Sequence, residues 1–413
     1  MTEHGSPGYF QQLSQALDTV ACARPVLVID KARLDYNIAQ LQQVLRRGFS
    51  FRLVAKSLPS LPLLDYVLRQ TDSQRLMCFH MPFLLQVLRY FDQADVMLGK
   101  PMPVTALGYF ERDAAAADVA VQARYDRVQW LVDTPERLLE YEAFARKHQR
   151  NLRICLEIDV GLHRGGFQAD TAFKSVLRHL ADSEHLRLAG LMGYEAHITK
   201  IPALFGGPKA AEGEAKASYQ RFVQLVRSDY GDVDGLCLNV GGSTTYPLYQ
   251  QEDLTFCNEI ATASALVKPS DFDVFTLSHH QAAAWIATPV LKVMQQPDLP
   301  GPPALSRLLR TLGVLPQQAC FTYGGNWLAD PVFPAQARRV KLFGHSSNQE
   351  MHSLPQDAGM KPGDWLYLRP MQSEAVLLQF GDIAVYENGQ ITEWWPVLDY
   401  PTRLDAPAQE APL

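Results

Sequence analysis

The sequence lacks several features that would assign it to an extreme class of protein. It has only 6 cysteines in 413 residues, none in a Cys-x-x-Cys pair, and several stand inside apolar runs such as 76–79 and 236–238. This usage is typical of buried thiols in a reducing compartment rather than of disulfides or a zinc site. No apolar run approaches the roughly 18 residues that span a bilayer, and the first ten residues contain no apolar segment of a signal peptide. We therefore expect a cytoplasmic protein without a membrane partner.

An excess of charge of one sign is also missing. The 38 Lys and Arg residues against 44 Asp and Glu residues give a formal net charge of −6. Such a balance provides no basic field to hold a nucleic-acid backbone, so we expect no nucleic-acid partner. With 47% hydrophobic and 20% charged residues, the composition is that of a globular chain that buries a sizeable core.

Short apolar runs alternate with amphipathic, helix-like stretches from about Pro25 to about Asp273. The runs cover residues 26–29, 52–55, 75–79, 95–98, 128–132, 152–158, 188–194 and 236–240. Short buried strands separated by helices indicate parallel βα units. Seven or eight such units over ~250 residues favour a (β/α)8 TIM-type barrel over an open doubly wound sheet.

The pattern changes after about Asp273, where strand-like runs follow one another without long helices. These runs cover residues 285–294, 339–343, 364–368, 382–386 and 390–395. Asn388-Gly389 separates the last two, and this dipeptide predicts a hairpin because both residues tolerate positive φ. We therefore expect an α/β protein with a barrel over residues 25–273, followed by a C-terminal β domain over residues 274–413 that residues 1–24 complete.

A lysine stands at the end of the first expected barrel strand. Lys56 directly follows the apolar run 51–55, and a side chain at this end of a strand faces the barrel mouth, where such folds place catalytic groups. Apolar neighbours disfavour the ammonium form, so this lysine could act as an amine that forms a Schiff base. Taken alone, such a residue is more often a lysine that reaches solvent from a strand end.

A loop with two glycines follows the seventh expected barrel strand and reads Gly241-Gly242-Ser243-Thr244-Thr245. Glycines let backbone N–H groups approach a phosphate closely, and these barrels commonly bind phosphate after strands seven and eight. An ordinary βα turn with small residues is an equal alternative. The sequence has neither G-x-G-x-x-G nor G-x-x-x-x-G-K-[ST], so no motif indicates a dinucleotide or a nucleoside triphosphate.

Two further strand ends carry polar side chains. Asp159 and Arg164 follow the run 152–158, where the arginine could donate to a cofactor oxygen or simply pair with the aspartate. His197 follows the run 188–194 and could act as a general base near neutral pH or be merely hydrogen-bonded. The placement of all these residues after barrel strands favours the functional interpretation of each.

These residues together resemble the fold-type III, alanine-racemase-type pyridoxal-phosphate (PLP) enzymes, and specifically the D-threonine aldolase and D-serine dehydratase group. The resemblance covers nearly the whole chain. It rests on residues 25–30, the Lys56 segment, and residues 159–166, 193–197, 241–244, 361–364 and 369–370.

The resemblance implies a role for each matching residue. Lys56 would carry PLP as a Schiff base and exchange a proton at the substrate Cα, and His197 would be the base near the substrate β-hydroxyl. The residues that would bind the cofactor are Lys56, Arg164 at the phenolic oxygen, Tyr194, and Gly241, Gly242, Ser243 and Thr244 at the phosphate. A homodimer is implied as well, because in relatives the β domain of a partner subunit closes the site.

The chain departs from the family at three places. The family's metal pair corresponds to Gln372 and Glu374, which would share a face if they lay on a strand. Their oxygen donors suit Mg, Mn or Ca rather than zinc; either the metal has changed, or it is gone and Glu374 moves protons or binds a cationic substrate. We favour no tightly bound metal. The family's Glu-x-Arg reads Glu259-Ile260-Ala261, and its Asp-x-Gly segment reads Tyr323-Gly324-Gly325-Asn326.

We therefore expect a PLP-dependent lyase that acts on a small β-hydroxy amino acid, of D configuration by resemblance, through retro-aldol cleavage or dehydration. Racemisation or another reaction at the α-carbon is one alternative, since it needs no metal pair. A non-catalytic PLP-binding protein, which would keep Lys56 and the glycine loop, is the other.

Overall fold

The apolar runs in the middle of the chain form a closed barrel of eight parallel strands in the computed structural model, which describes residues 5–115, 121–251, 256–340 and 344–399. Each strand pairs with the next along the chain, and β9 pairs with β2 to close the barrel. The strands are β2 (Ser50–Val54), β3 (Arg75–Cys78), β4 (Asp95–Leu98), β5 (Val128–Val132), β6 (Leu152–Ile158), β7 (Leu186–Gly193), β8 (Cys237–Val240) and β9 (Glu259–Thr262).

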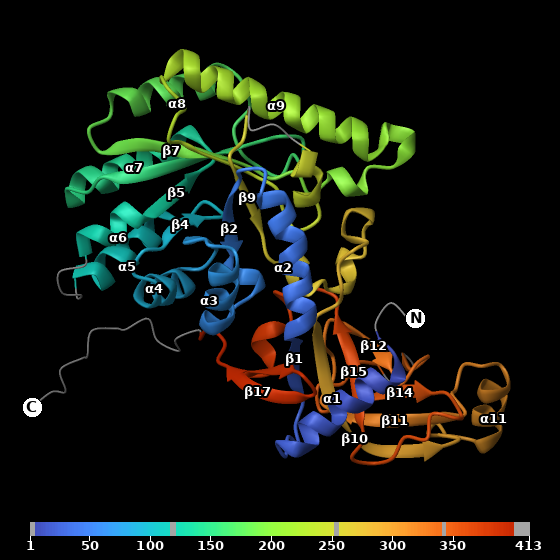
Figure 1. Cartoon of the computed structure of the whole chain (residues 1–413). Helices are drawn as coiled ribbons and strands as arrows, with labels where there is room; N and C mark the ends of the chain where they lie inside the picture. The colour runs from blue at the N-terminus through green and yellow to red at the C-terminus, as the bar shows by residue number, and fades with distance from the viewer. Residues whose placement is uncertain (1–4, 116–120, 252–255, 341–343, 400–413) are drawn as a thin grey trace, which may run out of the picture. The chain divides into compact units, whose positions relative to one another are not determined.

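Helices follow most of these strands and cover the outside of the barrel (Figure 1). Their starts have a local cause, since Thr134 and Asp170 accept hydrogen bonds from the first backbone N–H groups of α7 and α8. These helices are α3 (Leu61–Gln70), α4 (Met81–Tyr90), α5 (Val104–Ala115), α6 (Val121–Arg127), α7 (Pro135–His148), α8 (Thr171–Asp182) and α9 (Gly207–Asp229), and α2 (Lys31–Leu45) precedes β2. None of the described helices combines the length and apolarity needed to cross a bilayer.

A buried ionic cluster occupies the barrel interior. The Arg52 side chain, which is inaccessible to solvent, donates to Glu259 at 2.5 Å and to Asp95 at 2.7 Å. Arg75 reaches the second oxygen of Glu259 at 2.7 Å, and Arg153 reaches Asp95 at 2.6 Å. Arg52 and Glu259 are fully buried and would be costly to bury without each other, whereas Asp95, Arg75 and Arg153 are partly exposed.

The second assembly of strands is a nine-stranded, mostly antiparallel sheet in the order β13-β14-β11-β10-β1-β16-β17, with β15 paired to β10 and β12 paired to β15. Its β1–β16 pair is parallel. The strands are β1 (Val26–Asp30), β10 (Ala284–Gln295), β11 (Gln318–Tyr323), β12 (Ala329–Phe333), β13 (Arg338–Arg339), β14 (Gln349–Leu354), β15 (Trp365–Pro370), β16 (Ile383–Glu387) and β17 (Gln390–Trp395). The helices α1 (Pro7–Thr19), α10 (Ser264–Val267) and α11 (Pro303–Thr311) accompany them.

Helix α1 contributes the apolar residues that join it to this sheet. Phe10 and Leu13 are buried in one core cluster with Trp285 and Tyr367. The expected hairpin forms between β16 and β17, with φ of +52° at Asn388 and +81° at Gly389. The expected architecture, a TIM-type barrel followed by a β domain, is confirmed.

The two compact units have different bounds from the expected domains. One unit comprises residues 43–262 with 398–413, and the other comprises residues 1–42 with 263–397. Strand β1, which lies within the expected barrel domain 25–273, pairs with β10 and β16. The eighth barrel strand is β9, whose four residues include a glutamate and do not form an apolar run. Of the expected strand at 339–343, residues 341–343 lie outside the described part of the chain.

Replacing Glu259 with glutamine should lower the free energy of unfolding by about 3 kcal/mol, because Arg52 would stay buried with one carboxylate fewer. Urea titration followed by circular dichroism measures this loss. Asp229→Asn is the matched control, since its partner Arg178 is largely exposed. Equal midpoints for Glu259→Gln and wild type would show that the cluster does not stabilise the fold.

Acid should weaken the barrel through the same cluster. Burial opposes the effect, but the Arg52 guanidinium lowers the pKa of both Glu259 and Asp95 below their usual values of 4.5 and 3.8. Because the folded-state pKa lies below the unfolded one, the stabilisation is complete above the unfolded pKa and is lost as the pH falls through the folded pKa. The urea concentration at the midpoint of unfolding should therefore fall as the pH is lowered from about 5 to about 3. This fall should be smaller in Glu259→Gln.

Candidate functional site

Lys56 lies where the sequence places it, directly after the first barrel strand. It belongs to the short helix η1 (Ala55–Ser57) that follows β2. Its Nζ atom lies 4.3 Å from the centroid of the Phe79 ring, which follows β3. A Cβ atom on Gly99, at the end of β4, would lie 2.1 Å from that ring, so only glycine leaves room for it. The ends of three neighbouring strands thus set the position of the lysine.

The glycine loop follows β8 and contacts Tyr194, which follows β7. Gly241 has a φ of +88°, in the region that favours glycine. A Cβ atom on Gly242 would lie 2.6 Å from Cε2 of Tyr194. The Ser243 hydroxyl is hydrogen-bonded to that of Thr262 at 3.1 Å, which joins the loop to the end of β9. The two glycines therefore let neighbouring side chains pack directly on the backbone of this loop.

The buried side chain of Glu195 holds the glycine loop through hydrogen bonds. Glu195 is 2% exposed and accepts hydrogen bonds from the Gly241 N–H at 3.3 Å and the Tyr249 hydroxyl at 3.1 Å. Burial raises the pKa of Glu195. Its segment was noted in the sequence for His197, but nothing in the sequence distinguished this glutamate from an exposed one. Glu195, Phe79 and Gly99 are the residues of this region that sequence reasoning missed.

Arg164 lies against the same tyrosine. Its guanidinium carbon is 5.2 Å from the centroid of the Tyr194 ring, so Arg164, Tyr194 and Gly242 form one contact series. The loop that carries Arg164 is anchored by Asp159, which accepts hydrogen bonds from the Gly161 and His163 backbone N–H groups. Although burial opposes it, hydrogen bonding from His163 lowers the pKa of Asp159 to about 2. Asp159 thus pairs with its own loop.

His197 begins the short helix η2 (Ile198–Lys200) after β7, and its ring packs on Gly161. A Cβ atom on Gly161 would lie 3.0 Å from Nε2 of His197. Burial lowers the pKa of His197, and nearby His163 lowers it further against the opposite influence of Asp159 and Glu214. The imidazole is therefore neutral at neutral pH, as a general base must be.

The structure brings most of the predicted residues to one end of the barrel. Lys56, Arg164, Tyr194, His197 and the glycine loop all follow the carboxyl ends of parallel strands, and these ends meet at one mouth.

Gln372 and Glu374, at the position of the family's metal ligands, do not share the face of a strand. Gln372 and Glu374 follow the end of β15 rather than lying on a strand, so the alternation that would place both on one face does not apply. The Gln372 amide donates to Asp271 at 2.8 Å, and Ser373 between them is buried. Within the described residues, no group of three or more His, Cys, Asp or Glu side chains is placed to hold a metal ion.

The other two segments that differ from the family, Glu259–Ala261 and Tyr323–Asn326, have structural roles. Glu259 begins β9 beside Ser50 at the start of β2, away from Lys56 at the end of that strand, and it belongs to the ionic cluster. The Tyr323–Asn326 segment packs on Glu350, whose carboxylate accepts from the Asn326 N–H at 3.2 Å.

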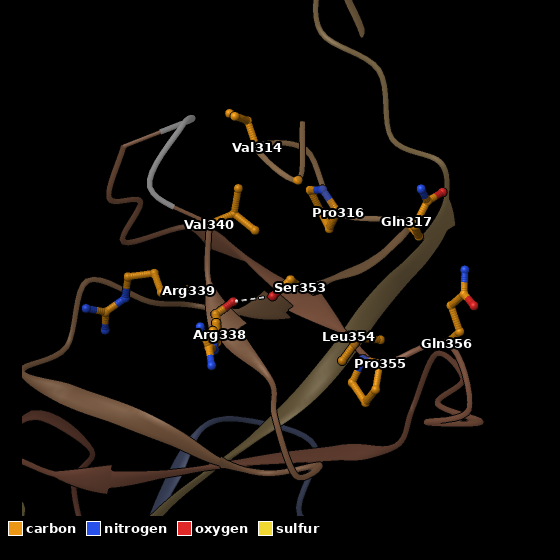
Figure 2. Close-up of a pocket in the computed structure, with 11 residues that line it drawn as sticks. Val314, Pro316, Gln317, Arg338, Arg339, Val340, Ser353, Leu354, Pro355 and Gln356 are labelled. Carbon is orange, nitrogen blue, oxygen red and sulfur yellow. Dashed lines mark hydrogen bonds between the residues drawn. The ribbon is translucent and has the colours of Figure 1, made fainter. Parts of the chain in front are cut away.

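A cavity of about 690 Å³ lies in the unit that contains the antiparallel sheet (Figure 2). Val314, Arg338 and Ser353 are among its lining residues, and the Ser353 hydroxyl donates to the Arg338 carbonyl at 3.2 Å. It contains none of the residues predicted for the site.

Comparison with known proteins places the chain in a family. The model of the alanine racemase N-terminal domain family matches residues 29–260. This is more than half of the chain, which therefore belongs to that family, and the resemblance to alanine-racemase-type enzymes is confirmed. A search of the curated proteins found no match.

Solved structures of the same fold include three kinds of enzyme. D-threo-3-hydroxyaspartate dehydratase from Delftia sp. HT23 is 16% identical, with a TM-score of 0.66 over 91% of this chain and 98% of that one. D-threonine aldolase from Filomicrobium marinum is 14% identical, with a TM-score of 0.69 over 91% and 97%. Alanine racemase from Clostridium difficile 630 is 14% identical, with a TM-score of 0.66 over 90% and 98%. At these identities the likeness shows the fold alone.

Replacing Gly242 with alanine should weaken PLP binding by about tenfold or more, because the new methyl group displaces the Tyr194 ring and with it the Arg164 contact. Titration of the PLP-free protein with PLP, followed by absorbance, measures the affinity. Gly213→Ala in α9 is the matched control, since a Cβ atom there meets nothing within 4 Å. Unchanged affinity in Gly242→Ala would remove the glycine loop from the site.

Proposed function

We propose that this chain is a PLP-dependent lyase that acts on a β-hydroxy D-amino acid, by retro-aldol cleavage or by dehydration. The main support is the position of Lys56 at the same barrel mouth as a glycine loop, in a chain of the alanine racemase N-terminal domain family. A hydroxyaspartate dehydratase and a threonine aldolase share its fold, and their names specify β-hydroxy substrates.

The residues at the mouth fit the cofactor. The glycine loop would hold the phosphate, and the Gly241 N–H, which donates to Glu195, fixes the position of this loop. Arg164 would donate to the phenolic oxygen, and Tyr194 lies between Arg164 and the glycine loop. When bound, PLP would supply an electron sink for the negative charge that develops at the substrate Cα.

The chain's own residues would handle the protons. Lys56 would hold the cofactor through its Nζ atom and, once released, remove or return the proton at Cα. His197 is neutral and can accept the proton of the β-hydroxyl, which leads to breakage of the Cα–Cβ bond. If the hydroxyl leaves as water instead, Lys56, which has taken the proton from Cα, can return that proton to the departing hydroxyl.

The proposal includes no step through a metal ion. The Gln372 side chain is hydrogen-bonded to Asp271, and it does not share a strand face with Glu374. Gln372 and Glu374 therefore do not form the pair of metal ligands found at this position in the family.

We also propose that the enzyme is a cytoplasmic homodimer. None of its six cysteines, all within the described residues, is in a disulfide, and five of them are buried, which suits a reducing compartment.

The purified protein should show the visible absorption of lysine-bound PLP, and borohydride should remove it. Lys56→Ala should lose this absorption, whereas Lys147→Ala, an exposed lysine on α7, should keep it. A small assay then separates the reactions: aldehyde from D-threonine, keto acid from D-serine, and solvent deuterium at Cα for racemisation. Deuterium incorporation without either product would contradict the lyase and favour the racemase.

A further inference from the structure

Two polar atoms in the segment after β7 are buried without a hydrogen-bond partner among the described residues. They are Nδ1 of His197 and Oγ1 of Thr199, which lie two residues apart at the start of η2. A buried polar atom that makes no hydrogen bond costs roughly 1–3 kcal/mol, and most such atoms in native proteins are paired. Two of them in one short segment at a barrel mouth indicate a group that the chain itself does not provide.

We propose that Thr199 joins His197, whose place near the β-hydroxyl is already implied by the family resemblance, in binding that hydroxyl, and that Thr199 determines specificity for hydroxylated amino acids. This inference rests on the proposed function. Its support is the location of the segment: His197 packs on Gly161 of the loop that carries Arg164, and Tyr194 at the end of the same strand contacts Gly242.

The chemistry of the two atoms favours a hydroxyl over a carboxylate. A threonine hydroxyl and a neutral imidazole can each act as donor or acceptor, and a hydroxyl ligand can donate to one while it accepts from the other. A carboxylate only accepts, and it would bring a charge into a buried corner. Burial lowers the pKa of His197, whose charged neighbours are His163, Asp159 and Glu214, so the ring presents no positive charge to attract an anion.

A site of this kind distinguishes hydroxylated from non-hydroxylated amino acids by the polar atoms that remain without a hydrogen bond. An amino acid without the hydroxyl would leave both buried atoms without partners, whereas a hydroxylated one would satisfy both. Because a water molecule can partly replace the missing hydroxyl, we expect a preference of about 10- to 100-fold rather than the full penalty.

The test uses stable ligands and does not depend on turnover. Reduction of the PLP Schiff bases of D-serine and D-alanine with borohydride yields phosphopyridoxyl-D-serine and phosphopyridoxyl-D-alanine, which differ by one hydroxyl. Their affinities for the PLP-free full-length protein are measured by calorimetry. The variants are Thr199→Val, which replaces the hydroxyl by a methyl group of similar size, and Thr199→Ser, which keeps it. Thr171→Val, at the exposed first residue of α8, is the control.

The proposal predicts that wild type, Thr199→Ser and Thr171→Val bind the serine adduct about 10- to 100-fold more tightly than the alanine adduct. In Thr199→Val the ratio should fall to within about threefold of one, mainly through weaker binding of the serine adduct. If Thr199→Val does not fold, a serine variant that loses the preference would overturn the proposal, because its hydroxyl remains.

The outcomes separate this inference from the proposed function. Equal affinity of the wild type for both adducts, together with normal PLP uptake, would overturn the hydroxyl site and leave the PLP enzyme intact. An equal loss of affinity for both adducts in Thr199→Val would also overturn it, since Thr199 would then act only on the shape of the segment. Failure to bind either adduct or PLP would overturn both.

Discussion

Closure of eight parallel strands into one barrel is the constraint on which the rest of the structure depends. Parallel strands end on the same side, so residues more than a hundred positions apart in the chain, such as Lys56 and Gly241, follow strand ends at one mouth. The β9–β2 pair completes this closure, and the buried Arg52–Glu259 ion pair joins the same two strands. The fold and the site thus depend on one pairing.

At the mouth of the barrel, the side chains of the site are positioned by close contacts with glycines. Gly99 admits the Phe79 ring beside Lys56, Gly242 admits the ring of Tyr194, and Gly161 admits His197. In each case a side chain from one strand end fills the space that a glycine leaves at another. Such contacts give a rigid arrangement because a single methyl group at these glycines would displace the neighbouring ring.

Much of this arrangement could be predicted from the sequence, because strand ends and loop composition are local properties. The runs at β2 through β8 are mostly apolar, and the positions of Lys56 and His197 follow from them. Strand β1 could not be assigned in the same way, since its five buried residues look like a barrel strand although its partners are β10 and β16. Strand pairing is decided by distant segments, and no local pattern reveals it.

The side-chain environment of the site was less accessible to sequence reasoning. Gln372 and Glu374 are two apart, but β15 ends at Pro370, so the period of a strand does not apply to them. Glu195 is a buried support of the glycine loop, and an isolated glutamate in a sequence gives no sign of burial. Burial and hydrogen-bond partners depend on the packed structure.

The central claim is that one lysine at the barrel mouth holds the cofactor. It is tested most directly by fixing PLP to the protein with borohydride, digesting the product and locating the modified residue by mass spectrometry. The account predicts a single phosphopyridoxyl group on Lys56. Modification of another lysine, or no modification in the presence of excess PLP, would contradict it.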